Sequence, residues 1–198
     1  MKPSKTRHLV LVVLFSIALS FQVFAQTTED SVQSVDLAAY PKASFHEGLA
    51  AVRIGDKYGY IDKDGRVVIK PRFDYAQIFS EGLARIVMKK RSGYIDKTGK
   101  TLIQPRFHKG FKFSDGLARV CAPPKNPTSL FRIARFLGWK DHYAYPCGYI
   151  DRTGKRVIDY QFLPASGFEN GYAKVTTLDG TQGYIDHSGK FFPTRPEQ

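Results

Sequence analysis

The chain has 198 residues, of which 42% are hydrophobic and 14% aromatic, and 30 Lys and Arg against 18 Asp and Glu give a net charge of +12. This length fits one domain or two small ones, and the apolar and aromatic content excludes an intrinsically disordered chain. The 17 Gly and 11 Pro show no collagen-like period. The excess of positive charge favours anionic partners.

The first 25 residues have the three-part pattern of a secretory signal peptide. Basic residues at positions 2, 5 and 7 precede an apolar run over 9–24, and Ala25 completes a cleavage site. An uncleaved membrane anchor is the alternative, but the run is shorter than the roughly 20 residues that span a bilayer. We therefore expect cleavage after Ala25, export to the periplasm or medium, and no transmembrane span afterwards. Residues 26–39 are then a linker and 40–198 the folded domain.

Two short motifs recur four times in the rest of the chain. Gly-Tyr-Ile-Asp begins at positions 59, 93, 148 and 183, and a motif with Phe, then Gly three residues later and Ala five residues later, begins near 45, 79, 113 and 168. The first three copies are spaced 34 residues apart, and the third carries an insertion over 122–146. A fixed period of this kind is typical of a repeat protein.

Each copy is expected to form short strands and not helices. Runs rich in Val, Ile and Tyr are separated by Gly turns, and no copy offers ten residues of helical periodicity. In the first copy we expect strands over 49–54, 57–62 and 66–70, ended by Pro71, which has no amide hydrogen to pair. Residues 72–78 would connect to the next copy.

The sequence thus predicts an all-β fold: a tandem array of four antiparallel, three-stranded meanders of about 34 residues each. A single meander is too small to be stable alone, so the copies must pack on one another. We expect an open or curved array, with a closed barrel or propeller as the alternative.

Comparison of the four copies predicts the buried positions. The first strand alternates small apolar residues, such as Ala50 and Val52, with a position that we expect to face outward. That outward position is occupied by Ala51, Arg85, Arg119 and Lys174. Apolar residues of the third strand are assigned to the core, namely Val68, Leu102, Val157 and Phe192, followed by Phe73, Phe107 and Phe162.

The pattern F-x-E-G-L-A-x-V, followed by G-Y-I-D-x-x-G-x-x-V-I-x-P-x-F, resembles the WG repeat family of bacterial proteins. The resemblance covers about residues 40–193. It departs from the family name before the motif glycine, where this chain has Tyr58, Ser92, Cys147 and Gln182. The resemblance implies an all-β protein used for binding or scaffolding, and it carries over no catalytic residue.

The two cysteines flank the insertion of the third copy. Alignment with the first copy gives Cys121 the position of Arg53 and Cys147 that of Tyr58, which should face each other as a non-hydrogen-bonded pair. A Cα separation of about 4.5 Å suits a disulfide, and export supplies an oxidising compartment. We therefore predict a Cys121–Cys147 disulfide, with two buried free thiols as the alternative.

The insertion itself is predicted to contain one short helix, which begins at Thr128 or Ser129 and ends at Gly138. Its apolar face either docks on the repeats or is offered to a partner protein or a membrane surface. The candidate binding residues of the insertion are Phe131, Arg132, Arg135, Phe136, Trp139, Lys140 and Tyr143.

Basic residues follow every Gly-Tyr-Ile-Asp motif. In repeats stacked with one orientation they would form a basic edge suited to an anionic glycan or to lipid headgroups. Alternatively, they keep the strand edges soluble and unpaired. The candidate basic-edge residues are Lys63, Arg66, Lys97, Lys100, Arg152, Lys155, Arg156 and Lys190.

The sequence contains no common signature of a hydrolase, a phosphate-binding loop or a metalloprotease. We predict no catalytic residue, no metal site and no cofactor, and we expect the motif aspartates, Asp62, Asp96, Asp151 and Asp186, to bond their own turns. The hypothesis is a non-catalytic binding or scaffold protein whose partner is a protein, an anionic envelope polymer or a lipid headgroup, and not nucleic acid. An enzyme acting on envelope polymers at an inter-repeat cleft is the alternative.

Overall fold

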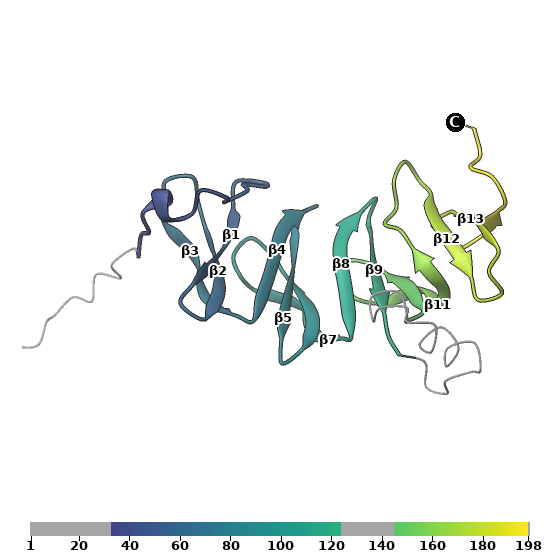
Figure 1. Ribbon diagram of the computed structural model, residues 1–198, viewed down its shortest axis with the longest axis horizontal. Helices are drawn as coiled ribbons and strands as arrows, with labels where there is room; N and C mark the ends of the chain where they lie inside the picture. Colours follow the sequence, from purple (N-terminus) through teal and green to yellow (C-terminus); the bar gives the residue numbers. More distant parts are fainter. Residues whose placement is uncertain (1–32, 124–144, 198) are drawn as a thin grey trace, which may run out of the picture. The chain divides into compact units, whose positions relative to one another are not determined.

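The computed structural model describes residues 33–123 and 145–197, which consist of strands and tight turns apart from one short 3-10 helix, η1 (Leu37–Ala39) (Figure 1). The strands are, in chain order, β1 (Ala50–Ile54), β2 (Lys57–Ile61), β3 (Val67–Phe73), β4 (Tyr75–Ser80), β5 (Leu83–Met88), β6 (Arg91–Ile95), β7 (Thr101–Phe107), β8 (Lys109–Ser114), β9 (Leu117–Cys121), β10 (Cys147–Ile150), β11 (Arg156–Ala165), β12 (Ala173–Thr177), β13 (Gln182–Ile185) and β14 (Phe191–Phe192).

The strands form three antiparallel sheets, and none of them closes on itself within the described residues. The orders are β1-β2-β3, β4-β5-β6-β7 and β14-β13-β12-β11-β10-β9-β8. The predicted all-β class and the predicted antiparallel meanders are confirmed, in the open form and not as a closed barrel. The helix predicted in the insertion lies outside the described residues.

The third strand of the first repeat is longer than predicted. β3 continues through Pro71 to Phe73, and its register with β2 shifts beside Gly59, so that residues 70–72 bulge opposite that glycine. A proline in a bulge removes no ladder hydrogen bond, so the prediction that Pro71 ends the strand was wrong. Gly59 fits this close approach because a Cβ there would lie 2.5 Å from the carbonyl oxygen of Ile69.

The predicted connection over 72–78 contains a further strand. β4 pairs with β5 and gives the second repeat a fourth strand, and β8 does the same for the third repeat by pairing with β9. The third and fourth repeats share one continuous strand. β11 pairs with β10 through its first part and with β12 through its second part. Each repeat therefore passes directly into the next.

The core follows the predicted alternation in the first strand. The repeated alanines Ala50, Ala84, Ala118 and Ala173 are fully buried, and the phenylalanines Phe73, Phe107 and Phe162 are buried as well.

The assignment of Val68, Leu102 and Val157 to the core was wrong, because they are 43–46% exposed. The next residue in each strand is buried in their place. In the first repeat this is Ile69, which pairs with the fully buried Tyr60 and therefore shares its face of the sheet. The equivalent buried residues in the other repeats are Ile103 and Ile158.

A buried tyrosine links each repeat to the next. The tyrosine of Gly-Tyr-Ile-Asp donates its hydroxyl hydrogen to a backbone carbonyl of the following repeat, at 2.7–2.8 Å, and each of these tyrosines is fully buried. Burial raises the pKa of each of these hydroxyls. The pairs are Tyr60 with Gln77, Tyr94 with Phe111, and Tyr149 with Ser166.

Two further sets of hydrogen bonds join the same repeats. A carboxylate in the tight turn before the first strand accepts from a glycine amide in the next such turn. An arginine near the end of the third strand donates to a glycine carbonyl of the next repeat. The carboxylate pairs are Glu47 with Gly82, Glu81 with Gly116, and Asp115 with Gly171. The arginine pairs are Arg72 with Gly99 and Arg106 with Gly154.

Residues 33–40, expected to lie in or next to a linker, contact the first repeat. The Val35 amide donates to the Gly65 carbonyl at 2.9 Å, and the Val67 amide donates to the Gln33 carbonyl at 2.7 Å. Val35 and Tyr40 pack against the buried cluster of β1 and β2. This segment therefore covers the end of the first repeat.

The predicted disulfide is confirmed. Cys121 and Cys147 lie directly opposite each other in the β9–β10 register and are bonded, with their Cα atoms 4.0 Å apart. The pair of the first repeat that served as the template, Arg53 and Tyr58, has the same register. The bond therefore closes the neck of the insertion.

The variant Tyr94→Phe tests the tyrosine link. We expect it to lower the free energy of unfolding by about 1–2 kcal/mol, because the partly buried Phe111 carbonyl loses its donor. Urea denaturation measures the change. Tyr184→Phe is the matched control, since this half-buried hydroxyl makes no hydrogen bond within the described part of the chain. Equal losses in both variants would contradict the role of the Tyr94 hydroxyl.

Removal of the disulfide is expected to destabilise the protein by about 3.5 kcal/mol, the chain-entropy value for cysteines 26 residues apart. Thermal unfolding with and without a reductant measures this effect. The double variant Cys121→Ser/Cys147→Ser should unfold at the lower temperature in both conditions. An unchanged midpoint for the native protein, after a thiol assay shows full reduction, would refute the expectation.

Candidate functional site

The four motif aspartates bond their own turns, as predicted. One carboxylate oxygen of each accepts backbone amides two and four residues later, at 2.9–3.0 Å. In the last three repeats a hydroxyl from Thr98, Thr153 or Ser188 also bonds this oxygen, and that bond lowers the pKa of Asp96, Asp151 and Asp186. These carboxylates therefore stabilise the turns to which they belong.

Part of the predicted basic edge is engaged in contacts within the protein. Lys97 Nζ lies 3.0 Å from the Glu47 carboxylate of the preceding repeat. The other contacts are Arg66 with Asp64 at 3.1 Å, Arg156 with Asp159 at 2.8 Å, and Lys190 over the Phe192 ring. The remaining edge residues, Lys63, Lys100, Arg152 and Lys155, are exposed. Binding by this edge stays a prediction.

The insertion candidates lie outside the described residues, so the structure does not place them. These are Phe131, Arg132, Arg135, Phe136, Trp139, Lys140 and Tyr143.

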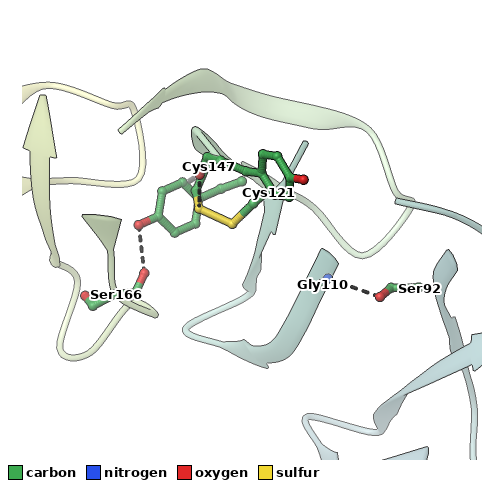
Figure 2. The surroundings of a disulfide bond; sticks show 7 residues. Ser92, Gly110, Cys121, Cys147 and Ser166 are labelled. Carbon is green, nitrogen blue, oxygen red and sulfur yellow. Dashed lines mark hydrogen bonds between the residues drawn. A yellow bond between two sulfur atoms is a disulfide. The ribbon is translucent and has the colours of Figure 1, made fainter. Parts of the chain in front are cut away.

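A pocket of about 310 Å³ lies where the third repeat meets the second part of β11. Its walls come from four strands and from the residue that precedes β10 by two positions. The lining residues are Lys109, Phe111, Arg119, Cys121, Tyr145, Cys147, Leu163, Pro164 and Ala165. Figure 2 shows the disulfide of this wall and, close by, the Ser92 hydroxyl that accepts the Gly110 amide.

Strand register explains why these side chains share one face. Lys109 of β8 pairs with Cys121 of β9, which in turn pairs with Cys147 of β10. Phe111 and Arg119 stand two residues from Lys109 and Cys121 respectively, and side chains two residues apart in a strand point the same way. Two cations and an aromatic ring are therefore set beside the disulfide.

The two cations are packed on a ring. The guanidinium carbon of Arg119 lies 3.6 Å from the centre of the Phe111 ring, and Lys109 Nζ lies 5.5 Å from the same centre. Burial lowers the pKa of Lys109, and the charges of Arg119 and Arg85 lower it further. The described lining includes no Asp or Glu. The pocket is therefore electropositive and suited to an anionic group.

Arg85 occupies the position of Arg119 in the preceding repeat. Its Nε donates to the buried Ser92 hydroxyl at 3.1 Å, and its guanidinium lies 5.7 Å from the centre of the Tyr75 ring. Burial lowers its pKa. Ser92, which stands where the family name has tryptophan, thus joins Arg85 to the Gly110 amide of the next repeat.

The prediction that Arg85 and Arg119 face outward was wrong, since both are half-buried. Aromatic rings of β4 and β8 pack on these two arginines. Both strands lie in segments that are expected, from the sequence, to be connections. For the same reason Lys109 and Phe111 were not identified as site residues. The available signal was the position of Lys109 and Phe111 two residues apart, shortly after Phe107.

Over residues 33–123 and 145–197 no group of three or more His, Cys, Asp or Glu is arranged to hold a metal ion. In the same ranges no helix has the length and apolar character needed to cross a membrane.

The model of the WG containing repeat family matches residues 39–58, 58–91, 93–121 and 148–180, which together make up more than half of the chain. Each matched segment contains one of the four copies of the Phe-containing motif, and the gap between the last two segments falls on the insertion. A comparison with curated proteins finds no match. The chain belongs to the WG containing repeat family.

Proposed function

We propose that this protein is an exported, non-catalytic binding protein that holds an anionic component of the cell envelope in the pocket between its third and fourth repeats. The observation that carries the proposal is the convergence of Lys109 and Arg119 on one concave site whose described lining has no carboxylate. The signal-peptide pattern of residues 1–25 supports export.

The electrostatics of the pocket favour an anion. A half-buried ammonium group next to two guanidinium groups is less stable in its charged form than an exposed one, as the lowered pKa of Lys109 expresses. A carboxylate or phosphate of a ligand would relieve this repulsion and form charge-assisted hydrogen bonds. The net charge, +12 for the full chain and +9 without the three basic residues of the segment 1–25, would also raise the rate at which anions meet the protein.

The other walls suit the body of such a ligand. Phe111, Tyr145 and Leu163 offer apolar surface next to the cations, a combination typical of small-molecule sites. Strands and a disulfide hold these walls, so little ordering is needed on binding. The described lining contains no pair of carboxylates for acid–base chemistry, and the proposal is therefore binding without catalysis.

Isothermal titration calorimetry with galacturonate tests the proposal, with uncharged galactose as the reference ligand. We expect galacturonate to bind, and Lys109→Gln to weaken its binding about 10-fold or more, since a charge-assisted hydrogen bond is lost. Lys112→Gln is the matched control, because this exposed lysine of the same strand does not line the pocket. No binding of galacturonate, or an equal loss in both variants, would overturn the proposal.

A further inference from the structure

Cations and rings of the second repeat are joined to the pocket strand β8, because Ser92 bonds both Arg85 and the Gly110 amide next to Lys109. The Tyr58 and Tyr75 rings lie 5.3 Å apart, and the guanidinium of Arg85 lies 5.7 Å from the centre of the Tyr75 ring. Lys109 in turn feels the charges of both Arg85 and Arg119. We call Arg85, Lys109 and Arg119 the cation strip.

The cation strip is a consequence of how the repeats join. Arg85 and Arg119 hold equivalent positions on β5 and β9, and Lys109 begins β8, which pairs with β9. Three hydrogen bonds hold the second repeat to β8. The Ser80 hydroxyl donates to the Phe113 carbonyl at 2.8 Å, the Tyr94 hydroxyl donates to the Phe111 carbonyl at 2.8 Å, and the Gly110 amide donates to Ser92 at 3.1 Å. The three cations therefore follow one another across a fixed junction.

The acidic residue next to the strip is already paired. Asp74, which precedes Tyr75, accepts from Lys57 Nζ at 2.5 Å and from the Lys89 amide at 2.8 Å. These bonds lower the pKa of Asp74, the Lys57 contact most strongly. Its charge is therefore compensated within the protein, and the strip keeps its positive character.

We infer that the cation strip binds a linear polyanion, a chain of carboxylated sugars whose successive carboxylates contact Arg85, Lys109 and Arg119 while one sugar unit occupies the pocket. This inference rests on the proposed function and names its ligand class. A single small anion in the pocket would leave Arg85, which lies on another repeat, outside its contacts.

The packing of the rings favours sugars over nucleic acid bases and bilayers. Bases bind single-strand sites by stacking on open ring faces, but Phe111 has the Arg119 guanidinium 3.6 Å from its centre. A flat bilayer surface does not enter a concave pocket, whereas a flexible chain of sugars does.

Calorimetry with galacturonate monomer, tetramer and octamer tests the inference. We expect the tetramer to bind at least about 10-fold more tightly than the monomer. Once one sugar unit is bound, the contacts of the other units form within the same complex. We expect Arg85→Gln to weaken tetramer binding about 10-fold, to change monomer binding much less, and to reduce the salt dependence of tetramer binding. Arg91→Gln, an exposed arginine on β6, is the matched control.

Circular dichroism melting shows whether Arg85→Gln is folded, and Arg85→Met serves as a second variant that keeps the apolar stem against Tyr75. Equal affinity for monomer and tetramer, with sensitivity to Lys109→Gln alone, would overturn the cation strip and leave the proposed function standing. Failure of every galacturonate to bind would overturn both. Tighter binding to single-stranded DNA or to phosphatidylglycerol vesicles than to the tetramer would overturn the ligand class.

Discussion

A buried tyrosine hydroxyl needs a hydrogen-bond acceptor, and in this protein the acceptor belongs to the next repeat. Tyr60 and Tyr94 reach carbonyls of β4 and β8, the strands that open the following repeats, and Tyr149 reaches the Ser166 carbonyl directly after β11. A buried polar group without a hydrogen-bond partner costs about 1–3 kcal/mol. Each of these tyrosines is therefore stably buried only when the next repeat supplies the acceptor. The hydrogen bonds of the turn carboxylates and of the arginines to glycines of the next repeat add to this dependence.

The candidate site follows from the same junctions. Because β8 is held against the second repeat, the charges of both Arg85 and Arg119 act on Lys109 and lower its pKa, after the larger effect of burial. Because β11 runs unbroken from the third repeat into the fourth, Leu163 and Ala165 form the wall opposite the cations. The disulfide adds a covalent tie at the insertion, where the third repeat departs from the pattern of the others.

Much of the fold could be predicted from the sequence, because a motif read four times shows which positions share an environment. The period, the turn aspartates and the register that joins Cys121 to Cys147 all came from that comparison. Two features could not be predicted. The bulge at Pro71 depends on which glycine faces it across the sheet, and the covering of Arg119 depends on a ring from a strand that looked like a connection. Each of these two features depends on a contact between segments that are separate in the sequence. The residue pattern of a single segment does not reveal such a contact.

The central claim is that Lys109 is a cation held among other cations in a site made for an anion. The most direct measurement is an NMR titration of the Lys109 side chain, in the free protein and in the protein saturated with galacturonate tetramer. The account predicts a pKa below that of an exposed lysine in the free protein and a rise when the anion is bound. A free pKa equal to or above that of an exposed lysine, or no rise on saturation, would contradict it.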